Sequence, residues 1–219
     1  YIEQGIPISY FKQENKGFGA ARNIAMENAK GDWIAIIDHD DICMPNRLES
    51  QVNDIINNPK AKLFFGNSIH MDSNGDFINY HFDGINPINF NLSKGKAAEN
   101  LLKHGCFIDS ETVIFNKKMA HSIGGFNETY KHVLDYEFFL RVGENYSIYC
   151  NDNVLSKWRI HARQATQTMG GIVHLENIKV CLDYINKRQI SLSVKSSLLL
   201  WILKLYVKYL FQFILKINK

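Results

Sequence analysis

The sequence predicts an α/β fold, because segments typical of strands alternate along the chain with segments typical of helices. The strand candidates are short and apolar, at residues 6–11, 33–37, 62–66 and 112–115, and the helix candidates lie at 20–29, 45–57, 117–123 and 136–142. Residues 33–37 (WIAII) are continuously apolar, which is typical of a strand buried on both faces of a parallel sheet. At 219 residues, the chain is long enough for one domain with a hydrophobic core.

Turn-forming residues separate these elements. Pro59 ends the helix that begins at Pro45, because proline cannot continue a helix. Residues 67–93 are polar and rich in turn formers, so we expect a loop or a hairpin there, with a turn at 72–75.

Charge divides the sequence into two parts. Residues 1–186 contain all 22 acidic side chains and 18 basic ones, whereas residues 187–219 contain seven basic side chains and no acidic one. We therefore expect a main domain over 1–186 and a basic tail over 187–219. The acidic balance of the main domain excludes a nucleic-acid binder that works through general basicity.

The tail is predicted to form an amphipathic helix over 192–219. Lys204, Lys208, Gln212 and Lys216 recur at every fourth residue and occupy one wedge of the helix, and apolar residues that include Trp and Tyr cover the rest. A lysine or glutamine on every turn argues against a transmembrane span. The pattern fits a helix that lies on an anionic membrane surface, and packing against the rest of the protein or a partner subunit is the alternative.

The four cysteines, Cys43, Cys106, Cys150 and Cys181, show no spacing typical of a zinc site or a disulfide framework. We expect reduced and mostly buried thiols, as in a cytoplasmic protein. Together with the basic tail, this predicts a cytoplasmic protein that is peripheral on the inner face of the cell membrane.

The most informative motif is the acidic cluster Asp38-His39-Asp40-Asp41, which directly follows the apolar run. If that run is a strand, the cluster lies at the carboxyl edge of the sheet, where open α/β folds bind ligands. Neighbouring carboxylates repel one another unless a cation lies between them, and Mg²⁺ or Mn²⁺ prefers such oxygen ligands and in turn holds phosphate groups. The alternative is that the cluster caps the next helix through Asp41.

Four segments, taken in order, resemble one enzyme family. They are NKGFGAARN at 15–23, IIDHDDICMPNRL at 36–48, IGGFNE at 123–128 and LDYEFFLR at 134–141. In this order and at these separations they resemble the inverting family 2 glycosyltransferases of the GT-A fold, and the resemblance extends from about residue 6 to residue 168. It implies a mixed sheet flanked by helices. It also implies transfer of a sugar, with inversion, from a UDP-linked or similar nucleotide-sugar donor to a hydroxyl of a glycan or lipid-linked acceptor, as in lipopolysaccharide or capsule synthesis.

The resemblance implies roles on the donor side of such a site. Asp38-His39-Asp40 matches the family's DxD motif, so Asp40 is expected to bind Mn²⁺ or Mg²⁺ beneath the donor diphosphate, and Asp38 to contact the metal or the donor. Arg22 and Asn23 match donor-contacting residues of the family. Gly17 would let the backbone pass close to the donor, or it would serve as a plain turn glycine.

On the acceptor side, Asp135 matches the family's general base, which draws the proton from the acceptor hydroxyl as that hydroxyl attacks the anomeric carbon. The family usually has Glu-Asp at this place, and here Leu134 stands where the glutamate would be. The alternative role for Asp135 is an N-cap of the helix that follows. Asp109 is expected to line the acceptor side, with a plain loop as the alternative.

Residues 158–166 resemble the family's downstream strand and loop, where a histidine often reaches the metal or the diphosphate. His161 is the candidate for that role, and a packed core histidine is the alternative. Arg163 is expected to help clamp the diphosphate, or else to be a solvated surface residue.

The nucleotide-binding half of the family begins with two strands that have no match here, and this sequence opens at the family's third strand. We therefore expect an N-terminally truncated part of a longer enzyme. A non-catalytic fragment or pseudoenzyme that docks on the membrane is the alternative function. A nucleotidyltransferase would share the metal chemistry, but it would have a glycine-rich phosphate loop followed by a lysine, which this sequence does not show.

Overall fold

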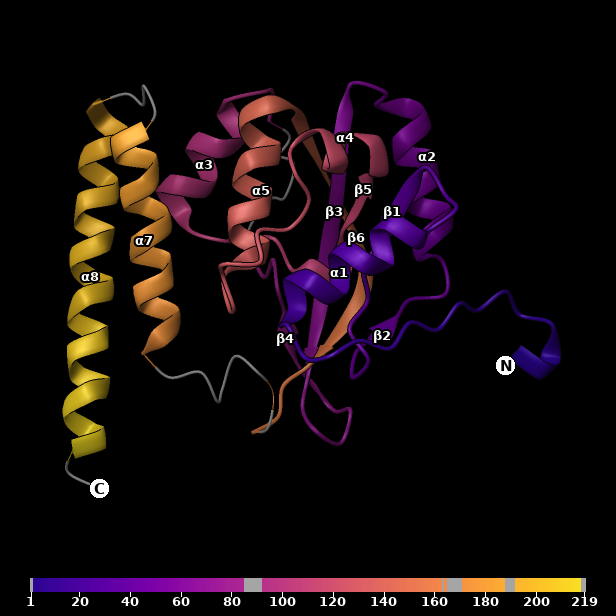
Figure 1. Cartoon of the computed structure of the whole chain (residues 1–219), viewed down its shortest axis with the longest axis horizontal. Coiled ribbons are helices and arrows are strands. Elements are labelled where there is room, and N and C mark those ends of the chain that lie inside the picture. The colour runs from indigo at the N-terminus through magenta and orange to yellow at the C-terminus, as the bar shows by residue number, and fades with distance from the viewer. Residues whose placement is uncertain (1, 85–91, 163, 165–170, 188–191, 218–219) are drawn as a thin grey trace.

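The computed structural model describes all residues except 1, 85–91, 163, 165–170, 188–191 and 218–219. In the described part, six strands form one mixed sheet in the order β1-β5-β3-β6-β2, and β4 pairs with the C-terminal end of β3. The strands are β1 (Trp33–Ala35), β2 (Ile42–Cys43), β3 (Ala61–Met71), β4 (Phe77–Tyr80), β5 (Ile114–Asn116) and β6 (Ser147–Arg159). Helices lie on both sides of this sheet (Figure 1), so the predicted α/β class is confirmed.

Helices occur where the sequence predicts them, and at two further places. The predicted helices are α1 (Phe18–Asn28), α2 (Arg47–Asn57), α4 (Lys117–Ser122), α5 (Leu134–Asn145) and α8 (Leu192–Ile217). The sequence did not indicate α3 (Lys96–His104) or α7 (Ile172–Lys187), and two short 3₁₀ helices are η1 (Ile2–Gln4) and η3 (Ser110–Thr112). The polar segment after β3 forms the predicted hairpin, and its turn is closed by a hydrogen bond from Gly75 N–H to the carbonyl of Asp72 at 3.1 Å.

The central strand β3 separates two apolar layers, because its side chains alternate between the faces of the sheet. Leu63 and Phe65 belong to the larger core, which includes residues of α3, α5, α7 and α8. Phe64, between them, points to the opposite face and packs in a small cluster with Ile55 of α2. Within the larger core the ring of Phe138 on α5 stacks on Phe126 with the centroids 4.4 Å apart, and it packs edge-on against Phe115 of β5 at 5.2 Å, which fixes α5 against the sheet.

The sequence predicted that residues 33–37 form a strand between parallel neighbours, and this prediction of the neighbours was wrong. β1 is a short strand that runs antiparallel to β5, and in the described part of the chain β5 is its one partner. The end of the run is split, since Ile36 is buried and Ile37 is exposed. An apolar run of this length does not distinguish a half-covered edge strand from one buried between parallel neighbours.

The expected strand at 6–11 does not form. Residues 6–11 form neither a helix nor a strand, and Ile6, Ile8, Tyr10 and Phe11 are all exposed. A β-strand requires a neighbour to satisfy its backbone groups, so apolar composition alone did not produce one here.

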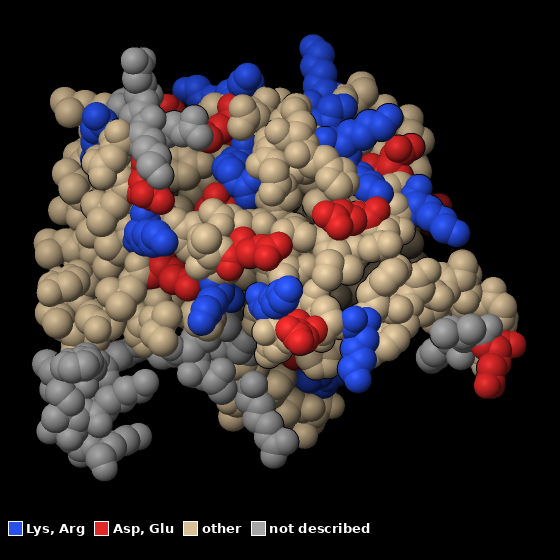
Figure 2. Space-filling model, viewed as in Figure 1, with Lys and Arg blue, Asp and Glu red and all other residues tan. Residues whose placement is uncertain are grey.

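The predicted tail helix is present and packs on the body through one side. α8 contacts α7 and α3, with Val194, Leu198 and Leu205 buried in the contact. Its opposite side exposes Leu199, Leu200, Leu203, Val207 and Phe211. The left edge of the molecule in Figure 2, where α7 and α8 lie in Figure 1, is mostly uncharged. The side chains of Gln212 and Lys216 lie outside the described residues.

None of the helices in the described part of the chain is long and apolar enough to cross a membrane. All four cysteines are free, as predicted, but only Cys150 and Cys181 are buried, whereas Cys43 and Cys106 are exposed.

Candidate active site

A buried arginine fixes the point at which the acidic cluster leaves the sheet. Arg47, in the first turn of α2, donates through Nη2 to the carbonyl oxygens of Ile36 at 2.8 Å and Val113 at 3.0 Å. Gln51 accepts from Nε of Arg47 at 3.2 Å and donates to the carbonyl of Thr112 at 2.8 Å. These bonds satisfy the backbone where β1 ends and β5 begins, so the cluster extends from a rigid base.

Asp40 and His161 lie together, although 121 positions separate them in the sequence. Nε2 of His161, which follows β6, is 3.0 Å from Oδ2 of Asp40. This hydrogen bond lowers the pKa of Asp40, so its carboxylate is ionised at neutral pH. A packed core histidine does not fit, because 26% of the His161 side chain is exposed. The backbone of Asp40 is held as well, since Nε of Arg159 donates to its carbonyl oxygen at 3.0 Å.

Asp41 faces β6 and does not cap the next helix. Its Oδ1 accepts a hydrogen bond from the backbone N–H of Arg159 at 2.8 Å, whereas Asn46 occupies the N-cap position of α2. Burial raises the pKa of Asp41 to about 6, although the Arg159 N–H lowers it, and the charges of Asp40 and Asp38 raise it further. Carboxylates crowded in this way favour a cation beside them.

Arg22 on α1 joins two acidic residues from distant parts of the chain. Its Nη1 pairs with Oδ1 of Asp135, and its Nη2 lies 3.4 Å from Oδ1 of Asp38. The guanidinium also lies over the ring of Phe126, 5.5 Å from the ring centroid. Arg22 therefore connects the exit of β1 to the N-terminus of α5.

Asp135 lies in the first turn of α5, and its side chain does not cap that helix. The N-cap is Val133, and no side chain forms a cap hydrogen bond there. The segment before α5 is held from α7 instead, because the carboxylate of Glu176 accepts from the backbone N–H of His132 at 2.8 Å. Burial raises the pKa of Asp135, and the charge of Arg22 lowers it. A carboxylate with a raised pKa is a better proton acceptor, which suits a general base.

A cleft of about 330 Å³ brings Arg22, Asp38 and Asp135 together with side chains that the sequence did not indicate, whereas Asp40 and His161 are not among its lining residues. Of the predicted residues it is lined by Arg22, Asp38, Asp109 and Asp135, and it is also lined by Glu111, Lys131 and Trp158. The combination of carboxylates, cations and an exposed aromatic surface suits a polar ligand with many hydroxyl groups, such as a sugar.

Two predicted donor residues have clear local roles in the structure. The amide of Asn23 accepts from the N–H of Phe126 at 2.8 Å and donates to the Phe126 carbonyl and to Oε1 of Glu128, both at 2.9 Å. Asn23 thus holds the IGGFNE segment against α1. Gly17 has φ +90° immediately before α1, a conformation that favours glycine, which supports the turn role among its two alternatives.

Asp109 lies in the cleft wall with partners that sequence reasoning missed. Its Oδ2 accepts from the hydroxyl of Ser68 at 2.5 Å and lies 3.3 Å from Nε2 of His70 and 3.2 Å from Nδ1 of His81. Asp109 lies in a segment without helix or strand, as the plain-loop alternative expects, and its side chain also lines the cleft. His70 lies near the end of β3, and His81 follows β4. This part of the sequence has no recognisable motif, so no local signal could have shown that the two histidines contact Asp109.

Glu111 is a further acidic residue of the cleft that the sequence did not single out. It is buried, and its Oε1 has no hydrogen-bond partner among the described residues. Burial, together with the charges of Asp109, Asp41 and Asp38, raises the pKa of Glu111 well above its usual range. The predicted diphosphate clamp, Arg163, lies outside the described residues.

The mixed sheet and the acidic cleft beside it place this chain among the α/β proteins that bind a polar ligand next to the sheet. The chain belongs to glycosyl transferase family 2, whose family model matches residues 1–123. An uncharacterized glycosyltransferase of Rickettsia felis is 32% identical over 170 residues, which cover 76% of this chain and 27% of that protein. The uncharacterized glycosyltransferase MJ1057 of Methanocaldococcus jannaschii is 30% identical and aligns with 74% of this chain and 54% of its own length. The chain thus spans between about a quarter and a half of these relatives.

Solved structures show the same fold at low sequence identity. S. aureus TarS, residues 1–349, matches with a TM-score of 0.56 and 15% identity, over 87% of this chain and 51% of that one. The mannosyltransferase PcManGT from Pyrobaculum calidifontis, in complex with GDP-Man and Mn²⁺, matches with a TM-score of 0.56 and 14% identity, over 90% of this chain and 52% of that one. The fold is therefore the GT-A fold, as the sequence motifs predicted.

Proposed function

We propose that the full-length protein transfers a sugar, with inversion, from a nucleotide-sugar donor to a hydroxyl group of a cell-surface glycan or its lipid-linked precursor. The observation that carries this proposal is the bridge made by Arg22. It contacts Asp38, on the donor side, and Asp135, the candidate base, inside one cleft. Such a bridge brings the bond that breaks and the hydroxyl that attacks into the same small volume.

A divalent metal fits the donor side. Asp40 and His161 present a carboxylate oxygen and an imidazole nitrogen 3.0 Å apart, and Asp38 and Asp41 lie close enough for their charges to act on one another. These donor types suit Mn²⁺ or Mg²⁺. We assign Asp40 and His161 as direct ligands, with Asp38 beside them, and Asp41 as a residue that supports the site. When bound, the metal would neutralise charge on the diphosphate leaving group.

The reaction at the acceptor is a single displacement. Asp135 takes the proton of the acceptor hydroxyl while its oxygen attacks the anomeric carbon, and the bond between that carbon and the diphosphate breaks on the opposite side. Arg22 contacts Oδ1 of Asp135, so we assign the proton to Oδ2. Arg22 and Asn23 position the cleft wall, and Asp109 lies on the acceptor side. Arg163, beyond the described residues, is proposed to contact the diphosphate.

The solved neighbour with GDP-Man and Mn²⁺ supports a nucleoside diphosphate sugar as the donor class, without fixing its base. The test is therefore made on the full-length protein with both UDP-linked and GDP-linked sugars. Release of the nucleoside diphosphate is measured with and without Mn²⁺, in the wild type and in Asp135→Asn and Asp40→Ala. We expect turnover to fall by about 10²-fold or more in Asp135→Asn while donor binding persists. Wild-type turnover in either variant would contradict the assigned roles, and Lys60→Gln is the surface control.

A second function is favoured by the row of exposed leucines on α8. We infer that α8 lies on the anionic inner surface of the cell membrane, through this row and through the exposed Lys204 and Lys208. If the chain served only for such docking, it would bind no nucleotide sugar. Calorimetry with a nucleotide sugar and Mn²⁺ therefore separates the enzyme from a docking fragment or pseudoenzyme.

A further inference from the structure

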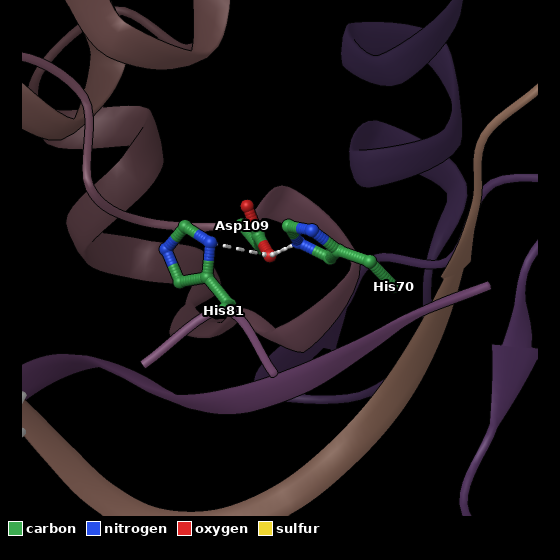
Figure 3. A group of neighbouring side chains, drawn as sticks. All are labelled: His70, His81 and Asp109. Atoms are coloured by element: carbon green, nitrogen blue, oxygen red, sulfur yellow. Dashed lines mark hydrogen bonds and ion pairs between the residues drawn. The ribbon is translucent and has the colours of Figure 1, made fainter. Parts of the chain in front are cut away.

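We propose that His70, His81 and Asp109 form a second metal site in the cleft wall, which takes a divalent ion that prefers nitrogen ligands, such as Zn²⁺. Figure 3 shows the Asp109 carboxylate between the two imidazole rings. Its Oδ2 is 3.3 Å from Nε2 of His70 and 3.2 Å from Nδ1 of His81, and one ligand atom from each residue lies within 4.8 Å of the others.

The distances from Oδ2 of Asp109 to the two imidazole nitrogens match those between neighbouring ligands of one metal ion. Zinc binds imidazole nitrogen and carboxylate oxygen at about 2.0–2.2 Å, so adjacent ligands in a tetrahedral arrangement are about 3.3–3.6 Å apart. The observed distances therefore need only small rotations of the side chains to close around a metal. Two imidazoles and one carboxylate leave the fourth position for water or for an oxygen of a ligand in the cleft.

The hydrogen bond that His81 makes to a backbone carbonyl also points to a cation. Its Nε2 lies 2.9 Å from the carbonyl oxygen of Phe107, which can only accept, so Nε2 carries a proton. In the neutral ring, Nδ1 then directs a lone pair at the carboxylate of Asp109, and two acceptors face each other. A metal ion between them removes this conflict. A histidine that donates its second ring N–H to a backbone carbonyl is the arrangement that metal-binding histidines commonly have.

The surroundings hold the carboxylate and leave access for an ion. The buried Ser68 donates to the same Oδ2 of Asp109 at 2.5 Å, which fixes the carboxylate. The ring of His70 packs edge-on against Trp158 with the centroids 4.8 Å apart. The side chains of His70, Asp109 and His81 remain 13%, 15% and 20% exposed, so an ion with its water can enter.

A bound ion would join three separate segments of the cleft wall. His70 lies on β3, His81 follows β4 and Asp109 precedes η3. The ion would tie the β3–β4 hairpin to the segment that leads into η3, on the side of the cleft where the acceptor is proposed to bind. The site has its own ligands, apart from Asp40 and His161, so metal binding here does not depend on the transferase activity.

The test uses Co²⁺ as a spectroscopic probe on the 219-residue chain after treatment with a chelator, and Zn²⁺ as the competitor. The variants are His70→Gln and His81→Gln, and the matched control is His121→Gln, an exposed histidine on α4. Asp40→Asn removes the other candidate metal ligand. We expect Asp40→Asn to bind one equivalent of Co²⁺ with imidazole-type absorption that Zn²⁺ displaces. The wild type and His121→Gln should bind this same equivalent in addition to any ion held by Asp40 and His161. The two ligand variants should bind at least about tenfold more weakly.

The proposal is overturned if Asp40→Asn takes up no such ion, or if both ligand variants bind as the wild type does. Circular dichroism checks that the variants fold. A measurement that keeps His70 and His81 in place covers the case in which they do not. X-ray absorption of the Zn²⁺-loaded Asp40→Asn chain should show two imidazole ligands at about 2.0–2.1 Å. A zinc shell without imidazole, or His81 doubly protonated by NMR in the presence of Zn²⁺, identifies a plain imidazolium–carboxylate pair and contradicts the metal site.

Discussion

Arg22 and Asp135 are separated by 113 positions in the sequence and form an ion pair across the cleft between α1 and α5. The pair determines the charge state of the candidate base, because burial raises the pKa of Asp135 while the guanidinium lowers it. The balance between these two effects keeps the Asp135 carboxylate, whose side chain is 25% exposed, available as a proton acceptor.

Replacing Arg22 should shift the pH dependence of catalysis. In Arg22→Gln the positive charge is lost and the burial remains, so the pKa of Asp135 rises. Since the base acts only when it is ionised, the acid limb of the kcat–pH profile should move to higher pH, by about one unit or more. Arg22→Lys retains a positive charge and should return the limb toward that of the wild type. An acid limb that is the same in Arg22→Gln and the wild type would exclude Asp135 as the titrating base.

The contact between Asp40 and His161 makes a separate prediction about metal dependence. If both are ligands, His161→Ala should raise the Mn²⁺ concentration for half-maximal activity by about tenfold, and saturating Mn²⁺ should restore part of the rate. The measurement is a Mn²⁺ titration of nucleoside diphosphate release by the full-length protein. His121→Ala serves as the control, because that histidine is exposed on α4. An unchanged titration in His161→Ala would remove this residue from the metal site.

The sequence was most informative about acidic residues that stand directly at the end of a strand or the start of a helix. The positions of Asp38 and Asp40 after β1, and of Asp135 at the start of α5, were predicted from motif order, and the structure has them there. The same motifs implied His161, and it contacts Asp40.

Long-range pairings could not be predicted in the same way. The apolar run at 33–37 indicated a strand but not its neighbour, and it proved to be antiparallel to β5. His70 and Asp109 meet only because β3 and the segment before η3 cross in space, and no spacing in the sequence encodes that approach. Glu111 lies in no motif either, because its raised pKa comes mainly from burial in the fold, with the charges of Asp109, Asp41 and Asp38 adding to it.

Arg47 is predicted to be essential for stability. It donates to two backbone carbonyls, one at the end of β1 and one just before β5, and it is 1% exposed. Arg47→Met keeps the length and the apolar stem of the side chain but leaves both carbonyls without this donor. We expect a loss of about 2–4 kcal/mol in the free energy of unfolding, measured with urea. The control Lys60→Met, at an exposed position before β3, should change stability by less than about 0.5 kcal/mol. A loss in Arg47→Met no larger than in this control would show that the network does not hold the cluster.

The exposed side of α8 predicts a charge-dependent interaction with membranes. Lys204 and Lys208 are exposed beside the leucine row, and each lysine near an anionic surface contributes about 1 kcal/mol. The double variant Lys204→Glu/Lys208→Glu should therefore lower the fraction of protein that sediments with phosphatidylglycerol vesicles by at least about tenfold at low salt. Raising the salt concentration should weaken wild-type binding in the same direction, because it screens the attraction. The double variant Lys60→Glu/Lys62→Glu makes the same change in net charge next to α2 and should leave binding nearly unaltered. If both double variants lose binding equally, net charge and not α8 accounts for the attraction, and if neither does, α8 packs only on the body of the protein.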